Sequence, residues 1–382
     1  MTSSLRGKAA IVGVGATPFA ELSAVPESPR SAYDLAADAF GRAVADSGLE
    51  KSDIDGLLCA RIPAYPHMAD ILGLRHLKFV NSFDGSGRMS GIALEVAVMA
   101  VASGLANTVA LVYGNNGRSA GTRYGGGDGA TPTTSFDSVY GMTSPGAYVA
   151  MMYQRYMHDF HVPDGALATL AINNRRNAML NPNAVMRSPV DIDTYMESRF
   201  IAEPLRLYDY CLINDGGVAL IVTTPDRARD LAKRPVYVRA TAACSDLSNY
   251  YTSTDYFYTA CNSVSSRIFA AAGVAREDVR CLQVYDNFTP TILFALEGFG
   301  YCDRGQAWSW ATSERISVQG ELPINTSGGH TSESYMQGWA LHVEAVRQVR
   351  GECGPRQVPG CDVVQYICPA PIVTSHILAC EP

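Results

Sequence analysis

Residues Leu322 to Gly338 read LPINTSGGHTSESYMQG, and this stretch decides how the rest of the chain is interpreted. A short strand pattern leads into the glycine pair Gly328-Gly329, with His330 directly after it and Tyr335 further on. Glycines at such a turn leave no side chain in the way, so a ligand can approach the backbone closely. We therefore predict that Gly328 and Gly329 bind part of a substrate.

A related turn lies upstream, where residues 79–91 read FVNSFDGSGRMSG. Asp84 follows a strand pattern at 79–83 and precedes a long helix of small residues expected from Gly87 to Leu105. A carboxylate at the start of a helix either faces a pocket or caps the helix. We predict that Asp84 contacts the substrate, with capping as the alternative.

The two halves of the chain repeat one order of elements. Residues 271–287 (AAGVAREDVRCLQVYDN) match residues 45–60 (ADSGLEKSDIDGLLCA) as a helix end, a glycine, an acidic connector and a strand. The segment INTSGG, with a helix expected at 332–350 and a strand at 362–368, likewise matches VNSFDGSG and the elements after it. Two halves rich in βαβ units predict a duplicated α/β fold.

Several local patterns add detail to this fold. Apolar runs predict buried strands at 8–14, 54–59, 108–113 and 216–223, and apolar periodicity predicts a helix at 31–47 that Gly48 ends. The motif GVGATPF after the first strand lacks the third glycine of a dinucleotide-binding turn. We therefore expect no nucleotide cofactor there.

The repeat also predicts how the chain divides. Residues 1–113 and 216–230 are expected to form the N-terminal half, and residues 231–382 the C-terminal half. The segment 114–215 is too long and irregular for a simple connector. We interpret it as an inserted loop domain that forms a substrate channel. Tyrosines just after a strand either line an apolar channel or belong to a packed surface loop: Tyr250, Tyr251, Tyr256 and Tyr258.

Composition excludes several classes of protein. The net charge is −7 and the chain has no run of Lys or Arg, which argues against nucleic acid and anionic membranes as partners. Its ten cysteines show no metal-binding spacing, which favours buried thiols in a reducing cytoplasm and no metal site. No stretch approaches the ~20 apolar residues of a membrane span. We expect a soluble cytoplasmic protein.

Together these motifs resemble the lipid-transfer-protein branch of the thiolase superfamily, over essentially the whole chain. The likeness is nearest to the CoA-thioester aldolases of bacterial steroid side-chain degradation. It rests on motifs in one order: GVGATPF, DGSG, DGGVALIV (215–222), YDNFTPTILFALEGFGYC (285–302), LPINTSGG and RGECGPRQVPG (350–360). The resemblance implies a five-layered αβαβα fold, an acyl-CoA substrate and a tight homodimer. It also implies a partner subunit of the OB-fold and zinc-ribbon type in a two-plus-two complex.

The resemblance further implies that the acyl-transfer residues of thiolases are replaced. Asp84 stands where thiolases carry the nucleophilic cysteine, and Tyr335 where they carry a histidine. Cys368 falls at the second thiolase cysteine, but it is followed by Pro-Ala-Pro. Because Asp84 cannot form a stable thioester, Claisen condensation is not expected.

Retro-aldol cleavage needs no covalent acyl intermediate, only proton transfers and stabilisation of an enolate. Tyr335 and Tyr285 are the two phenols predicted to carry the protons, if their surroundings match their pKa values to the task. Asp286 either orients a tyrosine or caps the next helix, and Asn287 is expected at the substrate. His330 either polarises the thioester carbonyl or is a satisfied core residue.

The expected function is therefore an aldolase without a cofactor. It would cleave a bulky β-hydroxyacyl-CoA, such as a steroid side-chain thioester, to a ketone or aldehyde and a short acyl-CoA such as propionyl-CoA. One alternative is a thiolase variant acting on an unusual β-ketoacyl-CoA. Another is a non-catalytic scaffold that binds acyl-CoA. Tyrosines and an aspartate stand where thiolases carry cysteine and histidine. This exchange favours an altered activity over random loss of the active site.

Overall fold

The strands and helices of the first half alternate as the sequence predicts. The computed structural model describes residues 5–25, 30–83, 89–122, 140, 142, 144–245 and 255–382. The elements of the first half are β1 (Ala10–Ala16), α1 (Phe19–Ala24), α2 (Ala32–Ser47), β2 (Gly56–Ala60), α3 (Tyr65–Leu72), β3 (Phe79–Phe83), α4 (Met89–Ala102), β4 (Thr108–Asn115) and, after the inserted segment, β7 (Gly216–Thr223). The predicted strands and the helix at 31–47 are thus confirmed within a few residues.

The second half follows the same path. Its elements are α9 (Pro225–Arg229), β8 (Val236–Ser245), α10 (Tyr258–Ala272), β9 (Cys281–Val284), α11 (Pro290–Gly298), α12 (Ala307–Trp310), α13 (Ser313–Ile316), α14 (Gly329–Ser332), α15 (Trp339–Arg350), β10 (Val363–Cys368) and β11 (Ile372–Ala379). Short 3₁₀ turns lie at Lys51–Asp53, Leu207–Asp209, Arg276–Asp278 and Gly354–Arg356.

The strand order confirms the duplication. Within the described residues, one sheet has the order β3-β2-β4-β7-β1-β8-β11-β10-β9. The centre of the sheet lies between β1 and β8. Outward from it, the first half has the order β1, β7, β4, β2. The second half has the corresponding order β8, β11, β10, β9. Ile324 pairs in parallel with Leu282 of β9, in the position that β3 takes beside β2.

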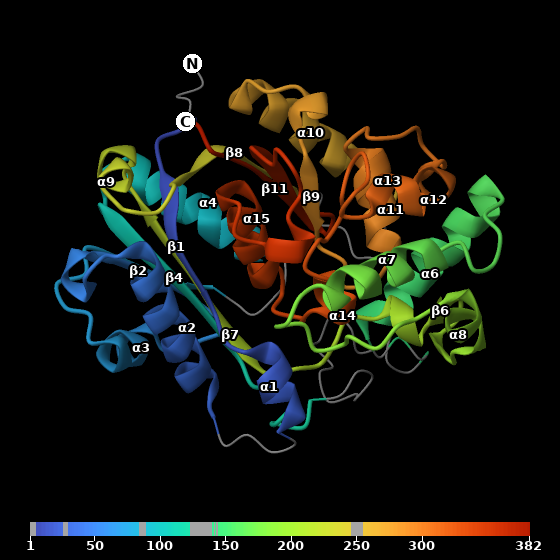
Figure 1. Cartoon of the computed structure of the whole chain (residues 1–382), viewed down its shortest axis with the longest axis horizontal. Helices are drawn as coiled ribbons and strands as arrows, with labels where there is room; N and C mark the ends of the chain where they lie inside the picture. The colour runs from blue at the N-terminus through green and yellow to red at the C-terminus, as the bar shows by residue number, and fades with distance from the viewer. Residues whose placement is uncertain are drawn as a thin grey trace.

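The helices form layers on and between the two halves of the sheet. Helix α2 packs on β1, β4 and β7, and α10 packs on β8 and β11. Helices α4 and α15 each contact strands from both halves. Figure 1 shows α4 and α15 in the middle of the molecule, with α2 and α10 on opposite sides. The five-layered αβαβα order follows from these contacts.

The connectors after α2 and α10 repeat in detail. Gly48 and Gly273 end the two helices with φ values of 70° and 63°, a left-handed conformation that favours glycine. Asp53 and Asp278 then accept the backbone N–H that begins each 3₁₀ turn, at 2.9 and 2.7 Å. The repeat seen in the sequence is therefore a repeat of hydrogen-bonded turns.

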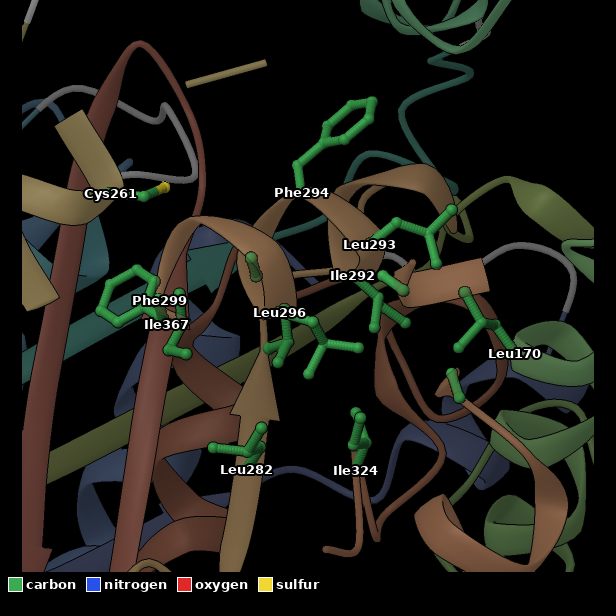
Figure 2. Close-up of a cluster of buried hydrophobic side chains, with 14 of the residues drawn as sticks. Leu170, Cys261, Leu282, Ile292, Leu293, Phe294, Leu296, Phe299, Ile324 and Ile367 are labelled. Atoms are coloured by element: carbon green, nitrogen blue, oxygen red, sulfur yellow. The ribbon is translucent and has the colours of Figure 1, made fainter. Parts of the chain in front are cut away.

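The segment expected as a loop domain, 114–215, contains regular structure. It holds α6 (Pro145–Phe160), α7 (Ala168–Met179), α8 (Ile192–Glu197) and a small sheet of β5 (Phe200–Ala202) and β6 (Leu205–Arg206). Its helices share a hydrophobic core with α10 and α11. Figure 2 shows part of that core, where Leu170 from α7 lies near Leu293 of α11. Every residue of α11 is buried, and the helix packs between α10, α12 and α6.

One predicted helix is wrong. The pattern favoured a single helix at 332–350, but α14 ends at Ser332 and α15 begins only at Trp339. Gln337 and Gly338 between them have positive φ values of 49° and 90°, which no helix tolerates. The irregular residues 333–338 carry Tyr335, so this break bears directly on the site.

Among the described residues, no helix is long and apolar enough to cross a membrane.

Candidate active site

Tyr285 is held at the point where a strand passes into a helix. Its backbone N–H donates to the carbonyl of Ile367 at 2.8 Å, which continues the ladder between β9 and β10. Its own carbonyl accepts from the Thr291 hydroxyl at 2.9 Å, in the first turn of α11. Pro290 starts that helix, at a position where proline is common. Backbone bonds on both sides therefore determine where the Tyr285 ring lies.

Tyr335 meets Tyr285 from the irregular segment between α14 and α15. Its backbone N–H donates to the Asn214 side-chain oxygen at 2.8 Å. The two phenol oxygens lie 2.8 Å apart, although the residues are 50 positions apart in the chain. Tyr285 is buried and Tyr335 is half-buried. The structure thus brings together the two tyrosines that the sequence singled out, with Tyr335 on the more open side.

His330 lies beneath both tyrosine rings. Its ring makes edge contacts with Tyr285 and Tyr335, at centroid distances of 4.6 and 5.3 Å. The backbone N–H of Gly338 donates to Nε2 at 3.0 Å, so Nε2 carries the lone pair and Nδ1 the proton. Nδ1 lies 3.3 Å from an oxygen of Asp286. Burial lowers the pKa of His330 to about 3, which keeps the imidazole neutral.

This placement bears on both roles expected for His330. Both ring nitrogens face protein groups, and the side chain is fully buried. Complete burial favours the role of a core residue, and a contact of His330 with a thioester carbonyl stays a prediction.

The Asp286 carboxylate accepts hydrogen bonds from the turn that carries His330 and from α7. One oxygen accepts the His330 backbone N–H at 2.9 Å, and the other accepts the side-chain amide of Asn174 at 2.7 Å. Complete burial raises the pKa of Asp286 to about 8, and the N–H donors of His330, Thr331 and Asn174 oppose that rise. Asp286 therefore positions His330 and has no direct contact with either phenol oxygen among the bonds described.

Gly328 and Gly329 allow other parts of the protein to pack closely against this turn, whereas the sequence suggested that they leave room for a substrate. A side chain at Gly329 would place its Cβ 2.4 Å from an Asp286 oxygen, and one at Gly328 would place its Cβ 2.6 Å from the Cβ of Ala178. Both residues have positive φ, at 61° and 111°. Protein atoms fill the space that these glycines leave, so binding of part of a substrate at this place stays a prediction.

Asparagines on and just after α7 hold the turn at residues 324–329, and the sequence analysis did not identify them. Four amides on or just after this helix donate to backbone or side-chain oxygens of the turn and of Asp286, namely those of Asn173, Asn174, Asn177 and Asn181. Asparagine is a poor helix former. Its repetition in AINNRRNAMLN was the signal that these side chains serve another purpose.

The remaining predicted residues are a buried asparagine, a buried cysteine that packs near Tyr285, and two residues outside the described chain. Asn287 is buried, and its carbonyl accepts the N–H of Cys211 at 3.0 Å. Cys368 is fully buried and packs in one apolar cluster with Tyr285 and Tyr366. Asp84 and Tyr251 lie outside the residues that the structure describes. Their predicted contacts with substrate stay predictions.

The two described tyrosines of this segment, Tyr256 and Tyr258, follow the packed alternative and not the channel. Tyr256 donates to Asp159 at 2.8 Å, and Tyr258 donates to the buried Glu297, which Tyr156 also contacts. Both rings are buried in an aromatic cluster against Phe294 and α6. They join the inserted segment to the core and do not line an opening.

The matches to known proteins fit this geometry. Residues 242–376 match the family model described as the thiolase C-terminal domain-like family. The 17-hydroxy-3-oxo-4-pregnene-20-carboxyl-CoA lyase of Mycobacterium tuberculosis is 37% identical, over 91% of this chain and 92% of the relative. The steroid side-chain-cleaving aldolase of Thermomonospora curvata is 36% identical, over 91% of this chain and 92% of the relative.

A solved structure extends the likeness to three dimensions. The Ltp2-ChsH2(DUF35) aldolase superposes on this chain with a TM-score of 0.89 and 32% identity, covering 99% of each chain.

Proposed function

We propose that this chain, which belongs to the thiolase superfamily and within it to the steroid side-chain-cleaving aldolases, cleaves a β-hydroxyacyl-CoA by a retro-aldol reaction. The observation that carries the proposal is the contact between the hydroxyls of Tyr285 and Tyr335, at 2.8 Å. Two phenols in contact can accept one proton and donate another without any covalent intermediate.

The reaction is balanced within the substrate. The β-hydroxyl loses its proton and becomes a carbonyl, while the bond between the α- and β-carbons breaks. The bonding electrons pass to the α-carbon as a thioester enolate, and a proton then returns to that carbon. The products are a ketone or aldehyde and a shorter acyl-CoA, and neither a metal ion nor another cofactor takes part in the proposal.

The arrangement of the pair suits these steps. Tyr335, on the more open side, is proposed to contact the substrate, and Tyr285 exchanges protons with it through their shared hydrogen bond. The neutral His330 ring and Asp286 hold both phenols in place. We propose Asn287, at the start of the same turn, as a group near the enolate, and Asp84 and Tyr251 as substrate contacts.

A steroid is the proposed acyl group. Two relatives at 36–37% identity are named for cleavage of steroid side chains, and one name specifies a 17-hydroxy group β to the CoA thioester. Cleavage of such a compound gives a ketone at the ring and propionyl-CoA. The proposal for this chain is the same pair of products.

Association with other chains is also part of the proposal. The similar Ltp2-ChsH2(DUF35) aldolase is named for a DUF35 component beside the aldolase, which supports a partner subunit of that kind. Strand β3 ends the sheet, and within the described residues it pairs only with β2. An open edge supports pairing with a second copy of the chain, so we propose a homodimer with two partner subunits, in the cytoplasm.

The decisive experiment compares two substrate classes. The chain, purified with its partner subunit, is incubated with a 17-hydroxy steroid side-chain CoA thioester, and the products are identified by mass spectrometry. We expect the ketosteroid and propionyl-CoA without added CoA. Cleavage of a β-ketoacyl-CoA that depends on free CoA, with no aldol cleavage, would show a thiolase instead.

A further inference from the structure

A second cluster of buried rings lies directly behind the tyrosine pair. It consists of His342 on α15, Tyr366 on β10 and His376 on β11, all fully buried. The rings of His342 and Tyr366 are tilted by 34° at a centroid distance of 4.0 Å, and the centroids of His376 and His342 lie 5.3 Å apart. The Tyr366 hydroxyl lies 3.1 Å from the Ser90 hydroxyl in the first turn of α4.

His342 reaches back to the residue that precedes its own helix. Its Nδ1 lies 3.0 Å from the carbonyl oxygen of Gly338. A carbonyl can only accept, so Nδ1 carries the proton. The helical bond from the His342 backbone N–H to the same oxygen is longer, at 3.4 Å. The imidazole therefore makes the shorter of the two bonds that hold this carbonyl.

Gly338 connects the two clusters. Its N–H donates to His330 Nε2, while its carbonyl accepts from His342. At a φ of 90°, the residue is in a conformation that glycine adopts easily but does not hold by itself. A Cβ here would lie 2.6 Å from the Tyr366 oxygen and 3.3 Å from the Tyr285 ring. Bonds at its two ends, together with this close packing, hold it in place.

We propose that His342 is a positioning residue that acts on the site through Gly338. By holding the Gly338 carbonyl, His342 keeps the Gly338 N–H directed at His330 Nε2. His330 thereby stays in the tautomer whose Nδ1 proton faces Asp286, with its ring beneath Tyr285 and Tyr335. The effect on turnover rests on the proposed function, whereas the effect on the His330 tautomer does not.

The test uses three variants of the full chain, each in the assembly in which the wild type is purified. His342→Leu removes the donor, whereas His342→Asn keeps an N–H donor near the position of Nδ1. His376→Leu is the matched control, because it removes a buried imidazole of the same cluster that has no bond to Gly338. The chain has seven histidines, so ¹⁵N-histidine labelling gives a spectrum in which each ring can be assigned.

In the wild type, we expect Nδ1 to be protonated in both His330 and His342. In His342→Leu, the ¹⁵N shifts of His330 should move toward a mixture of tautomers. Its kcat should fall between about 10- and 100-fold with KM within about twofold, because small misplacements at a site have effects of this size. His342→Asn should restore most of the wild-type His330 shifts and most of the kcat. His376→Leu should change neither the His330 shifts nor the kcat.

Three outcomes would overturn the proposal. They are a wild-type His342 protonated on Nε2, a His342→Leu variant with unchanged His330 shifts, and a His376→Leu variant with the same losses as His342→Leu. The first is measured on the wild type and holds even if His342→Leu fails to fold. A wild type without aldol activity, in which the His330 tautomer still depends on His342, would refute the proposed function alone.

Discussion

Tyr335 and Tyr285 are the residues on which the proposed chemistry depends, and each can lose its hydroxyl without losing its ring. We expect Tyr335→Phe and Tyr285→Phe each to lower kcat by about 10²-fold or more, the usual scale for loss of acid–base catalysis. Only one hydrogen-bonding group is lost, worth roughly 1 kcal/mol, so the melting temperature should change little. Steady-state kinetics and thermal unfolding measure the two effects.

The double variant tests whether the pair acts as a unit. Because the two hydroxyls contact each other, Tyr285→Phe/Tyr335→Phe should be far less than multiplicatively worse than either single variant. Near-normal turnover in Tyr335→Phe would mean that the chemistry lies elsewhere.

Asp286 predicts how stability depends on pH. Burial raises its pKa to about 8 in the folded chain, from an ordinary value of 3.8. Between these values only the folded chain binds the proton, so the free energy of unfolding falls as pH rises. The lowered pKa of His330 acts in the opposite direction, but only below its ordinary value of 6.5.

From pH 6.5 to 8 the wild type should therefore lose stability, with Asp286 contributing up to about 2 kcal/mol. Glu333, whose pKa burial raises to about 7, contributes in the same direction. Asp286→Asn should reduce the loss even if it lowers stability at every pH. Denaturant titrations at both pH values measure it, and equal losses in the two chains would contradict the assignment.

Cys368 distinguishes this site from that of a thiolase. The thiol is fully buried and lies in the apolar cluster behind the tyrosines. We expect Cys368→Ala to keep most of the turnover, since no step of the proposed reaction uses a thiolate. Incubation of the wild type with acyl-CoA should leave its intact mass unchanged. An inactive Cys368→Ala variant with a normal melting temperature, or an acyl adduct on any cysteine, would indicate covalent catalysis.

At the scale of elements, the site depends on a turn held between α7 and the sheet. The carbonyls of Ile324 and Asn325 have side-chain amides from α7 as partners, in place of a further strand. Gly329 lets Asp286 approach the backbone of this turn. The helix, the turn and the carboxylate therefore form one hydrogen-bonded unit beneath the two phenols.

Gly329→Ala tests that unit. The new methyl would lie 2.4 Å from an Asp286 oxygen, in addition to the strain of a positive φ. Gly351→Ala is the matched control, because Gly351 also has positive φ but nothing within 4 Å of an added Cβ. Both variants should lose about 1 kcal/mol or more of stability, and only Gly329→Ala should also lose most of its turnover. Equal turnover in the two variants would show that the turn does not position the site.

At the scale of the whole molecule, exposed apolar side chains concentrate in the inserted segment. Of the 13 large hydrophobic residues that are exposed among those described, 8 lie between residues 140 and 207. A mainly apolar groove of about 580 Å³ lies along α6 beside β5, with Met151 and Ala202 in its lining. We propose that the partner subunit inferred from the likeness to the Ltp2-ChsH2(DUF35) aldolase binds in this groove, because apolar surface exposed to water is commonly used for association.

Met151→Glu tests this face. A charge in the groove should prevent co-purification of the partner subunit while leaving the fold intact, since Met151 is 48% exposed. Met99→Glu is the control, because Met99 on α4 is 43% exposed and lies outside the segment. Affinity purification of co-expressed chains measures the outcome. Retention of the partner by Met151→Glu would place the interface on another surface.

The local structure of this protein and the repeat of its two halves follow from short stretches of its sequence. Apolar runs, glycine stops and acidic connectors mark β1, α2 and the paired turns at Gly48 and Gly273, because each depends on neighbours within a few residues. The resemblance of the ordered motifs also identified Tyr285 and Tyr335, through their positions in the chain. These features could be predicted because each depends on residues close together in the sequence.

The contacts of those residues with distant parts of the chain depend on the packing of the whole fold. The helix expected at 332–350 is interrupted because Gly338 is held between His330 and His342, and neither contact is visible in local propensity. Tyr258 is buried because a carboxylate on another helix accepts its hydroxyl. The Tyr285–Tyr335 contact joins residues 50 positions apart, and the packing of α7, α15 and the sheet sets that distance. Long-range packing can override a local preference, which is why these contacts required the folded structure.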